Sequence, residues 1–462
     1  MNPAEYRASL ADGRRVFYDG KLVENVADHP KFRGVVDRVA AGYSGERGLN
    51  SDNAYDFPTT ADELRARMEE LIGWEGSLLM TLESLLALGT AAGRMPDTDE
   101  YRTYSGRMRA FAESCKQRDV RAVPCISDAK GHRALGPGKQ DDPDMYVRVV
   151  EKNDDGIVIR GAKLHITNAA VSHELMVMPT KRMKADEAQW AVACAVPVNA
   201  PGVTVMNTIA LPPDDERDYH PYSRSHGLPE GFVVFDDVFV PNERVFLCGE
   251  TEHSATFAHS IGLWQRIGGA AHMAEHADKL VGLARLLAEA NGIDKIPHIR
   301  EKIADLILYA TIVRSGLEAA ISNATITADG VAAPNELYTN AAKYYGALHL
   351  SEAVALIYDI AGGSIVTAPM PGDIANPETR PYVDKYMRTA PGIDGEYRTR
   401  LFHAARDITV SAAAGHFQVA TIMGGGGLFA QKLVATMHYD LEHAKTLARS
   451  MIGDLRPQES TT

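Results

Sequence analysis

Polar and cationic groups converge in the segment Ser127-Asp-Ala-Lys-Gly-His-Arg133, where a helical pattern gives way to a β pattern. Lys130 and Arg133 are cations of the kind that bind a pyrophosphate, and Ser127 and Asp128 complete the polar set. A solvated charged loop would have the same composition. The segment alone therefore leaves a phosphate site and a plain surface loop open as interpretations.

A second polar cluster, His165-Ile-Thr-Asn168, lies at the end of a β-rich stretch. Alternation along a strand predicts that His165 and Thr167 lie on the same face. These side chains, with Asn168, could hydrogen-bond the edge of a flavin ring, or they could satisfy backbone groups at the end of a sheet. Both readings remain open at this point.

Four consecutive glycines, Gly424, Gly425, Gly426 and Gly427, separate two helical patterns. Their bare backbone amides could approach a phosphate beside the N-terminus of the following helix, which also carries Gln431. A helix C-cap followed by a flexible connection explains the same glycines equally well.

Motifs for other cofactors are weak. No G-x-G-x-x-G follows a predicted strand and no Walker A sequence is present, so a Rossmann domain is not supported. His272-Met-Ala-Glu-His276 matches the H-x-x-E-H pattern of one zinc peptidase class, but no third ligand accompanies it. A zinc ribbon or dithiol motif is not encoded either, because no C-x-x-C spacing occurs among Cys115, Cys125, Cys194 and Cys248.

Length and composition set the broad class of protein. The chain has 462 residues, which is too long for one compact core, and 45% of them are hydrophobic. The formal charge of -13 argues against a nucleic-acid surface or a basic membrane patch. The first residues lack the apolar core of a signal peptide, and no apolar run is long enough to span a bilayer. We therefore expect a cytoplasmic, globular protein.

The elements that must position these groups fall into three parts of an α+β fold. Residues 1–119 are predicted as a mainly helical domain, and residues 120–250 carry short strands rich in β-branched residues. Residues 251–455 have the long helical periodicity of a bundle, and 456–462 are predicted as a disordered tail. Because no helical pattern separates the strands, a β-barrel or sandwich is favoured over a βαβ sheet.

In combination, five segments resemble the 4-hydroxyphenylacetate 3-hydroxylase / 4-hydroxybutyryl-CoA dehydratase family. They are Asp128–Arg133, Gly161–Asn168, Ala195–Gly202, Val238–Gly249 and Asp359–Gly363, and the likeness runs from about residue 5 to about residue 455. The resemblance implies the acyl-CoA dehydrogenase-like fold, with a helical N-terminal domain, a β-barrel middle domain and a C-terminal helical bundle. It also implies FAD between the last two, with contacts at Ser127, Asp128, Lys130, Arg133, His165, Thr167, Asn168, Gly424, Gly425, Gly426, Gly427 and Gln431.

One branch of the family, the dehydratases, uses FAD and a 4Fe-4S cluster held by three cysteines and one histidine. In this chain the cysteine position in the stretch Gly262–Ala270 holds Ala270, the histidine position falls near Leu263, and no cysteine follows Leu88. Neither Ala270 nor Leu263 has a side chain that binds iron. The position of a glutamate in the family falls near Ala420. The resemblance thus predicts FAD without an iron–sulfur cluster.

The other branch consists of monooxygenases that take reduced FAD from a separate reductase. They handle a phenol with an Arg-x-Pro-Asp-Tyr loop and a histidine. Here the loop reads Arg94-Met-Pro-Asp97-Thr98, so the arginine is present and the tyrosine is replaced. The histidine position falls near Pro124, which argues against a simple phenol. Substrate contacts are predicted at Arg94, Asp97, Thr98 and Pro124.

We interpret the chain as the oxygenase component of an FADH₂-dependent monooxygenase acting on a small organic, including aromatic, substrate. Arg94 would orient the substrate, and Thr167 would bond the reactive flavin edge. The alternative is a cluster-free FAD enzyme acting on an acyl-CoA thioester as a dehydrogenase, isomerase or dehydratase, with candidate bases Asp97, Asp99, Glu100 and Glu230. A non-catalytic, structural or flavin-storage relative is the third interpretation.

Two partners are expected besides the substrate. The monooxygenase branch implies a flavin reductase as the source of FADH₂. Long apolar C-terminal helices, such as the one predicted over Leu348–Ile360, exceed what one bundle needs to cover itself. Because the resembled family assembles through this region, the chain is predicted to form a homo-oligomer, as a tetramer.

Overall fold

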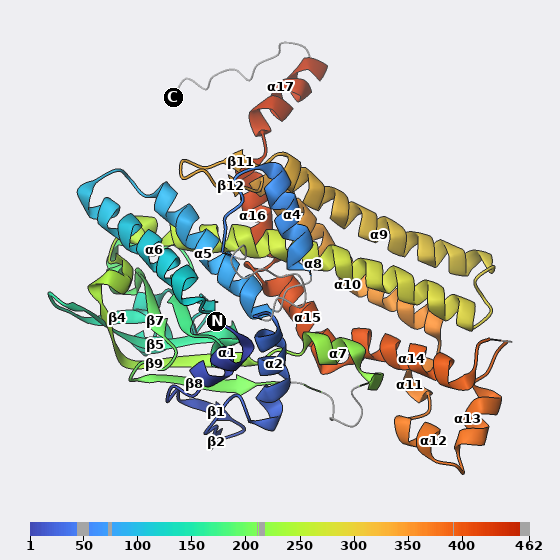
Figure 1. The fold of residues 1–462 in the computed structure, drawn as a ribbon. Coiled ribbons are helices and arrows are strands. Elements are labelled where there is room, and N and C mark those ends of the chain that lie inside the picture. The colour runs from blue at the N-terminus through green and yellow to red at the C-terminus, as the bar shows by residue number, and fades with distance from the viewer. Residues whose placement is uncertain (44–54, 73–75, 210, 212–217, 391, 453–462) are drawn as a thin grey trace.

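The structure is a computed structural model that describes residues 1–43, 55–72, 76–209, 211, 218–390 and 392–452. A β-rich region lies at one side of the molecule, and a bundle of long helices lies at the other (Figure 1). The tail predicted at 456–462 lies outside the described residues.

Two open sheets make up the β-rich region. One has six strands in the order β2-β1-β8-β9-β5-β4, and the other has four in the order β10-β7-β6-β3. The predicted β-barrel is therefore not closed among the described residues, because the edge strands of neither sheet pair with the other sheet. A barrel and a pair of sheets share the same two-residue alternation, so the sequence could not distinguish them. The strands are β1 (Val16–Tyr18), β2 (Lys21–Leu22), β3 (Ala122–Cys125), β4 (Arg148–Lys152), β5 (Gly156–Thr167), β6 (Glu174–Val177), β7 (Val192–Pro197), β8 (Val203–Thr208), β9 (Glu230–Pro241) and β10 (Val245–Cys248).

The N-terminal region is not wholly helical. Strands β1 and β2 form a hairpin whose turn residues, Asp19 and Gly20, have φ values of 49° and 74°. Two successive positive φ values fit the tight turn expected of an Asp-Gly pair. Strand β1 also pairs in parallel with β8, so this hairpin belongs to the six-stranded sheet although it precedes residue 119.

Strands β5 and β9 form the central ladder of that sheet. They pair antiparallel from Gly156 opposite Pro241 to Thr167 opposite Glu230. The register shifts near Gly161, where φ is 129° and an added Cβ would lie 2.8 Å from the backbone of Val147. Glycine is required there by both conformation and space. The ladder ends with Thr167 and Glu230 side by side.

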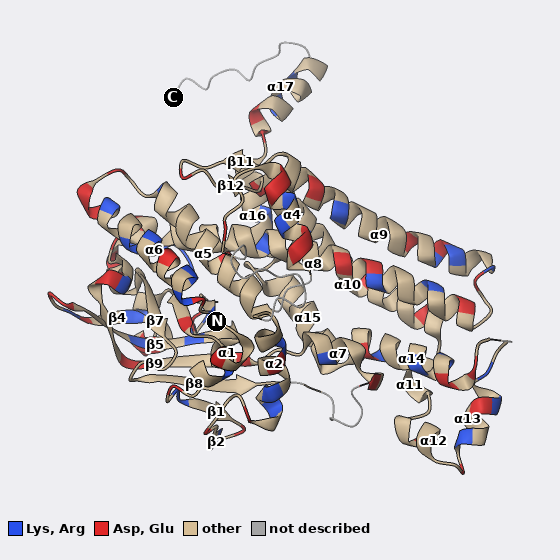
Figure 2. Cartoon of the chain, in the orientation of Figure 1, with Lys and Arg blue, Asp and Glu red and all other residues tan. Residues whose placement is uncertain are grey.

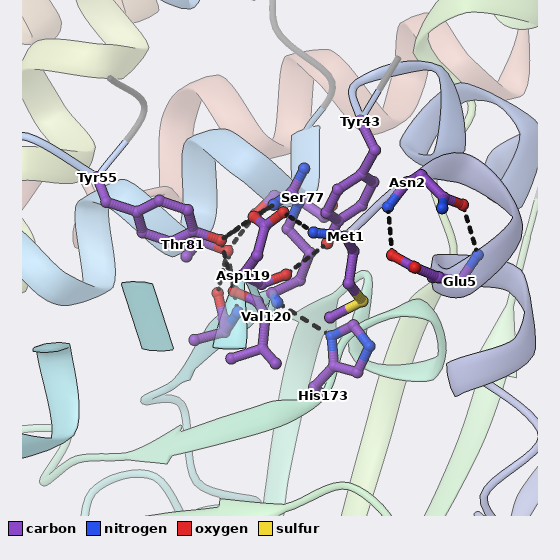
Figure 3. Close-up of polar contacts among 12 residues, drawn as sticks. Met1, Asn2, Glu5, Tyr43, Tyr55, Ser77, Thr81, Asp119, Val120 and His173 are labelled. Carbon is purple, nitrogen blue, oxygen red and sulfur yellow. Dashed lines mark hydrogen bonds and ion pairs between the residues drawn. The ribbon is translucent and has the colours of Figure 1, made fainter. Parts of the chain in front are cut away.

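The N-terminal helices are α1 (Pro3–Ser9), α2 (Pro30–Ala41), α4 (Ala61–Leu71), α5 (Gly76–Arg94) and α6 (Asp99–Arg118). Helix α6 ends at Asp119, whose φ of 52° turns the chain into β3. The Tyr55 hydroxyl donates to the Asp119 carboxylate and to the Val120 carbonyl, at 3.1 and 3.0 Å (Figure 3). The Tyr43 hydroxyl donates to the Asp119 carbonyl at 3.1 Å. These contacts fix the junction between α6 and β3, which belongs to the four-stranded sheet.

The C-terminal bundle is built on α8 (Ser254–Ala290), which packs against α5, α9 (Pro297–Ser322) and α10 (Glu336–Ala361). Among the described residues, α5 is the one helix long and apolar enough to cross a membrane, and 72% of its most apolar stretch is buried inside the fold. Helices α5 and α8 are therefore core elements. They are apolar on several faces because several neighbouring helices cover them. The other elements are α7 (Pro221–His226), α11 (Ser364–Thr367), α12 (Pro371–Ala375), α13 (Arg380–Tyr386), α14 (Gly395–Val410), α15 (Ala412–Met423), α16 (Leu428–His438), α17 (Leu441–Met451), β11 (Thr325–Ile326) and β12 (Ala332–Ala333).

A buried ion pair joins the two sheets. Lys163, in β5, lies 2.7 Å from the Asp128 carboxylate, and both side chains are 2% exposed. The Lys163 ammonium also donates to the carbonyls of Ile126 and Met178, at 2.9 Å each. Asp128 in turn accepts from the backbone N–H of Val147 at 2.9 Å. The segment after β3 is thus held against β5 by charge and hydrogen bonds together.

Replacing Lys163 with Met is expected to lower the free energy of unfolding by about 3–5 kcal/mol, because it leaves the Asp128 carboxylate buried without its cation. Urea denaturation followed by circular dichroism measures this loss. The exposed Lys139 provides the matched change: Lys139→Met should alter stability by less than about 0.5 kcal/mol. Equal losses in the two variants would show that the ion pair does not stabilise the fold.

Candidate functional site

A cavity of about 500 Å³ lies where the end of β5 meets helices of both the N-terminal region and the bundle. Thr167 enters it from β5, Glu83 from α5, His272 from α8, Lys343 from α10 and His416 from α15. Five separate elements therefore contribute polar side chains to one cavity. Apolar walls complete it, from Leu79, Met80, Leu228 and Phe417.

Thr167, Glu230 and His416 form a hydrogen-bonded chain at this cavity. The Thr167 hydroxyl donates to Glu230 Oε1 at 2.7 Å, and His416 Nε2 lies 2.6 Å from the same oxygen. The hydrogen bond to the Glu230 carboxylate raises the pKa of His416 above its usual value, against the effect of burial. The arrangement can hold a proton on His416, and it orients Thr167 at the cavity wall.

Two further ionisable groups are buried beside the cavity. Burial raises the pKa of the Glu83 carboxyl to about 8. Burial lowers the pKa of the Lys343 ammonium to about 8, and the nearby Arg266 guanidinium adds to that effect. Glu83, Lys343 and His416 were not among the site residues predicted from the sequence. The one available signal was an acidic or basic residue on the apolar face of a predicted helix, at Glu83 and Lys343.

The H-x-x-E-H pair does not gather metal ligands. His272 borders the cavity, whereas His276 stacks on Phe417 with ring centroids 4.2 Å apart. Burial lowers the pKa of His276 to about 3, and Glu275 pairs with Lys279 at 3.0 Å. Among the described residues, no group of three or more His, Cys, Asp or Glu side chains is arranged to hold a metal ion.

The predicted phosphate-binding segment places several cations together. Burial lowers the pKa of Lys130, and the nearby charges of Arg133 and Lys181 act in the same direction. Ser127 contributes its carbonyl to a backbone bond with Leu164 at 2.7 Å. Asp128 is engaged in the ion pair between the sheets. Lys130, Arg133 and Lys181 thus lie near one another, whereas the Asp128 carboxylate has a structural partner already.

The predicted shared face of His165 and Thr167 is not formed. A second register shift between Lys163 and Ile166 interrupts the alternation of β5, and His165 adopts a φ of 61°. His165 is consequently exposed, whereas Thr167 borders the cavity. Asn168 is fully buried, and neither its amide oxygen nor its amide nitrogen has a hydrogen-bond partner among the residues that the structure describes.

The glycine loop is held mainly by its carbonyls. Arg266 donates through Nε to the Gly425 carbonyl at 2.8 Å, and the Gln431 amide donates to the Gly426 carbonyl at 3.0 Å. Gly425 and Gly426 have φ values of 69° and 94°, so the left-handed backbone explains glycine there. Gly424 borders the cavity, and the buried amide oxygen of Gln431 has no hydrogen-bond partner within the described part of the chain.

The predicted substrate residues lie outside the lining of this cavity. Arg94 is exposed and pairs with Glu336 at 2.8 Å, and Asp97 pairs with Arg102 at 2.7 Å. Thr98 is the N-cap of α6, and Pro124 is buried in β3. Of the candidate bases, Asp99 and Glu100 are exposed as well, and Glu230 alone lies beside the cavity. The substrate roles of Arg94, Asp97, Thr98 and Pro124 stay predictions.

Replacing Glu230 with Gln is expected to lower the pKa of His416 below its ordinary 6.5, because burial then acts without the carboxylate. Titration of the histidine ring signals by NMR measures the change. The raised folded pKa stabilises the wild-type fold below the unfolded value near 6.5, and this contribution is lost as the pH rises through the folded pKa. Glu301→Gln, at an exposed position in α9, should leave His416 unchanged. An unshifted His416 in Glu230→Gln would contradict the pairing.

Comparisons with known proteins agree with this architecture. The N-terminal family of 4-hydroxyphenylacetate 3-hydroxylase matches residues 2–247, and the C-terminal family matches residues 254–453. The chain is 28% identical to a 4-hydroxybutyryl-CoA dehydratase/vinylacetyl-CoA-Delta-isomerase from Clostridium aminobutyricum, over 98% of this chain and 99% of that one. It is 26% identical to a 4-hydroxyphenylacetate 3-monooxygenase oxygenase component from Thermus thermophilus, over 86% and 85%.

Solved structures show the same fold. A 4-hydroxybutyryl-CoA dehydratase from N. maritimus has a TM-score of 0.88 at 25% identity, covering 100% of this chain and 97% of that one. The oxygenase component of 4-hydroxyphenylacetate 3-monooxygenase complexed with FAD also has a TM-score of 0.88, at 24% identity and 98% coverage of each chain. With the acyl-CoA dehydrogenase-like fold and both family matches, the chain belongs to the 4-hydroxyphenylacetate 3-hydroxylase family.

Proposed function

We propose that this protein is the oxygenase component of a two-component, FADH₂-dependent monooxygenase that hydroxylates a small organic substrate, including aromatic ones. The observation that carries the proposal is the position of Thr167. It ends β5 at the wall of a cavity of about 500 Å³, so a flavin edge and a substrate would meet in one cavity. Several relatives named as oxygenase components support the assignment.

The residues present fit a flavin dinucleotide. Lys130, Arg133 and Lys181 supply the positive charge that a diphosphate requires. The buried amide of Asn168 offers a donor and an acceptor that have no partner among the described residues, as a ring edge would need. Thr167 and Asn168 would hold the ring, and the cation cluster would hold the diphosphate. When bound in its reduced form, FAD supplies the electrons that activate O₂, with one oxygen atom going to the substrate and the other to water.

The chain's own side chains would then control protons and water at the substrate. His416, held by Glu230, keeps a proton beside the cavity and can donate it as the substrate changes charge. The apolar walls limit water there, which protects a reactive oxygen species from hydrolytic loss. A separate flavin reductase would supply FADH₂.

An iron–sulfur cluster does not fit the residues at the family's ligand positions. Ala270 and Leu263 are buried apolar side chains of α8, with a methyl and a branched alkyl group where ligands would be needed. Dehydration that depends on such a cluster therefore has no route through these positions.

A second candidate is a cluster-free FAD enzyme that acts on an acyl-CoA thioester. The likeness to two 4-hydroxybutyryl-CoA dehydratases favours it, and Glu230 places a carboxylate base beside the cavity. Reduction of bound FAD by an acyl-CoA under anaerobic conditions would support this candidate.

Purified protein supplied with FADH₂, a set of phenols and isotopically labelled O₂ is expected to transfer one labelled oxygen atom to a substrate. Mass spectrometry of the product measures the transfer. Thr167→Val should lower the yield of hydroxylated product per O₂ consumed, whereas Thr167→Ser keeps the hydroxyl and should retain it. FAD reduction by butyryl-CoA without any labelled product would replace this proposal with the thioester candidate.

We also propose that the protein assembles as a homo-oligomer, a tetramer. Helices α16 and α17 expose large apolar side chains, and α17 buries none of its residues and projects from the fold (Figure 1). Helix α15 carries no Lys, Arg, Asp or Glu, and α16 carries one such residue, Lys432, so this region offers little charge to oppose burial (Figure 2). Such a face is typical of a subunit interface.

Light scattering of the wild-type chain is expected to give a multiple of its 50.2 kDa mass. The double variant Leu447→Lys, Met451→Lys should lower that multiple, because the two substitutions add charge to the apolar face of α17. The control variant Thr446→Lys, Ser450→Lys adds the same charge at exposed positions elsewhere on the helix and should leave the assembly intact. A wild-type monomer of 50.2 kDa would overturn the proposal.

A further inference from the structure

Helix α7 forms a short wall of the cavity, and other elements hold it at both ends. At its start, the Asp407 carboxylate of α14 accepts hydrogen bonds from two backbone N–H groups of the helix, at 2.7 and 2.9 Å. At its other end, the Arg38 guanidinium of α2 donates to the Arg224 carbonyl at 2.8 Å and to the Gly227 carbonyl. Such a short helix is not stable alone, so these contacts set the position of the side chains that it carries.

His226 is the last residue of α7 and borders the cavity, as Tyr222 does. The two rings are stacked, with centroids 4.2 Å apart and planes at 11° to each other. Nδ1 of His226 lies 3.1 Å from the Tyr222 carbonyl oxygen and 2.7 Å from Ser225 Oγ. One ring face and two contacts at a single nitrogen therefore fix the orientation of the imidazole.

The contacts at Nδ1 decide which nitrogen of His226 carries the hydrogen. A carbonyl oxygen can only accept a hydrogen bond, so Nδ1 donates to Tyr222. The Ser225 hydroxyl donates to the Pro221 carbonyl at 2.9 Å, and its oxygen can accept from Nδ1 as well. In a neutral imidazole with its hydrogen on Nδ1, the other nitrogen, Nε2, keeps a lone pair.

The surroundings of His226 keep the ring neutral near pH 7. Burial lowers its pKa to about 4, and the charges of Lys279, His272 and Arg38 act in the same direction, against the bond to the Tyr222 carbonyl. All three of these basic residues border the same cavity. Nε2 has no hydrogen-bond partner in the described part of the chain. An acceptor lone pair is thus left for a ligand.

The cavity consequently has two histidines of opposite character. His416, held by Glu230, has a raised pKa and can donate a proton. His226 has its one hydrogen bonded to the backbone and can only accept at Nε2. The complement of this lone pair is an O–H or N–H group, because an anionic oxygen has no hydrogen to offer.

We propose that His226 is a substrate-binding residue whose Nε2 accepts a hydrogen bond from a hydroxyl group of the substrate. Two classes of substrate carry that group: a phenol, and a thioester whose acyl chain bears a hydroxyl. The inference rests on the proposed function in that it takes this cavity as the substrate site. It deepens that function, because a site that bonds a substrate hydroxyl rejects the analogue that lacks it.

The first test compares 4-nitrophenol with 4-nitroanisole, in which a methyl ether replaces the hydroxyl. The full-length protein, alone and loaded with FAD, is studied by calorimetry at a pH where the phenol keeps its proton. The phenol is expected to bind about tenfold more tightly, because the ether has no hydrogen to donate. Tighter binding of a third probe, 4-nitrobenzoate, would show that the cations Arg38 and Lys279 hold the ligand and would overturn the inference.

Three variants separate the acceptor from the shape of the site. His226→Phe keeps a ring that can stack on Tyr222 but has no acceptor, and it should bind the phenol and the ether alike. His226→Gln places an amide oxygen near the position of Nε2 and should keep the wild-type preference to within about threefold. His298→Phe, at an exposed position in α9, should match wild type. A preference for the phenol that survives in His226→Phe contradicts the role of Nε2.

The imidazole nitrogens provide a readout that a merely structural histidine would not give. In protein with isotopically labelled histidine, NMR is expected to show a hydrogen on Nδ1 of His226 and none on Nε2 at neutral pH. The signal is assigned by its loss in His226→Gln. 4-Nitrophenol should move the Nε2 signal, and 4-nitroanisole should leave it in place. An Nε2 that carries hydrogen, or that does not respond to the phenol, overturns the inference.

4-Hydroxybutyryl-CoA and butyryl-CoA provide the second arm, which distinguishes the two classes of substrate. A preference that depends on His226 within the phenol and ether pair alone identifies a phenol site. The same dependence within the thioester pair alone identifies a hydroxyacyl site. A preference within neither pair overturns the inference. These measurements involve no turnover, so a failed labelled-oxygen experiment would reject the monooxygenase and leave the role of His226 standing.

Discussion

The buried Lys163–Asp128 ion pair is the constraint on which the site's arrangement depends. It joins the segment after β3 to the middle of β5. The Lys163 ammonium also donates hydrogen bonds to two backbone carbonyls. A charge buried without such partners would be too costly to keep, so the two sheets are held in one relation. Strand β5 then continues to Thr167, which is consequently fixed against the helices. Lys130 is fixed too, two residues beyond Asp128.

Burial also decides which groups at the cavity carry charge. Burial raises the pKa of Glu83, which has no charged partner among the described residues, whereas Glu230 has His416 and Thr167 as partners. Two carboxyl groups at one cavity therefore serve different chemistry, because their surroundings differ. Lys343 and His416 show the same contrast among the bases: burial lowers the pKa of the first, and a carboxylate raises the pKa of the second.

Much of the fold follows from local pattern. The short strands between residues 120 and 250 and the long helices after residue 251 were predicted from their β-branched residues and helical periodicity. Closure of the barrel was not predictable, since it depends on whether edge strands meet in space. The bulge that turns His165 outward was missed for a related reason: alternation assumes an uninterrupted ladder, and the register shift breaks it.

The sequence by itself determined the order of helices and strands, the cationic character of the segment at Lys130 and the lack of iron ligands at Ala270 and Leu263. Tertiary structure alone decided that Asp128 serves the ion pair and that Glu83, Lys343 and His416 meet at one cavity. These residues lie on three helices far apart in the chain. Periodicity tells which face of a helix is buried, but the packing of other helices decides what that face touches and how far a charge is removed from water.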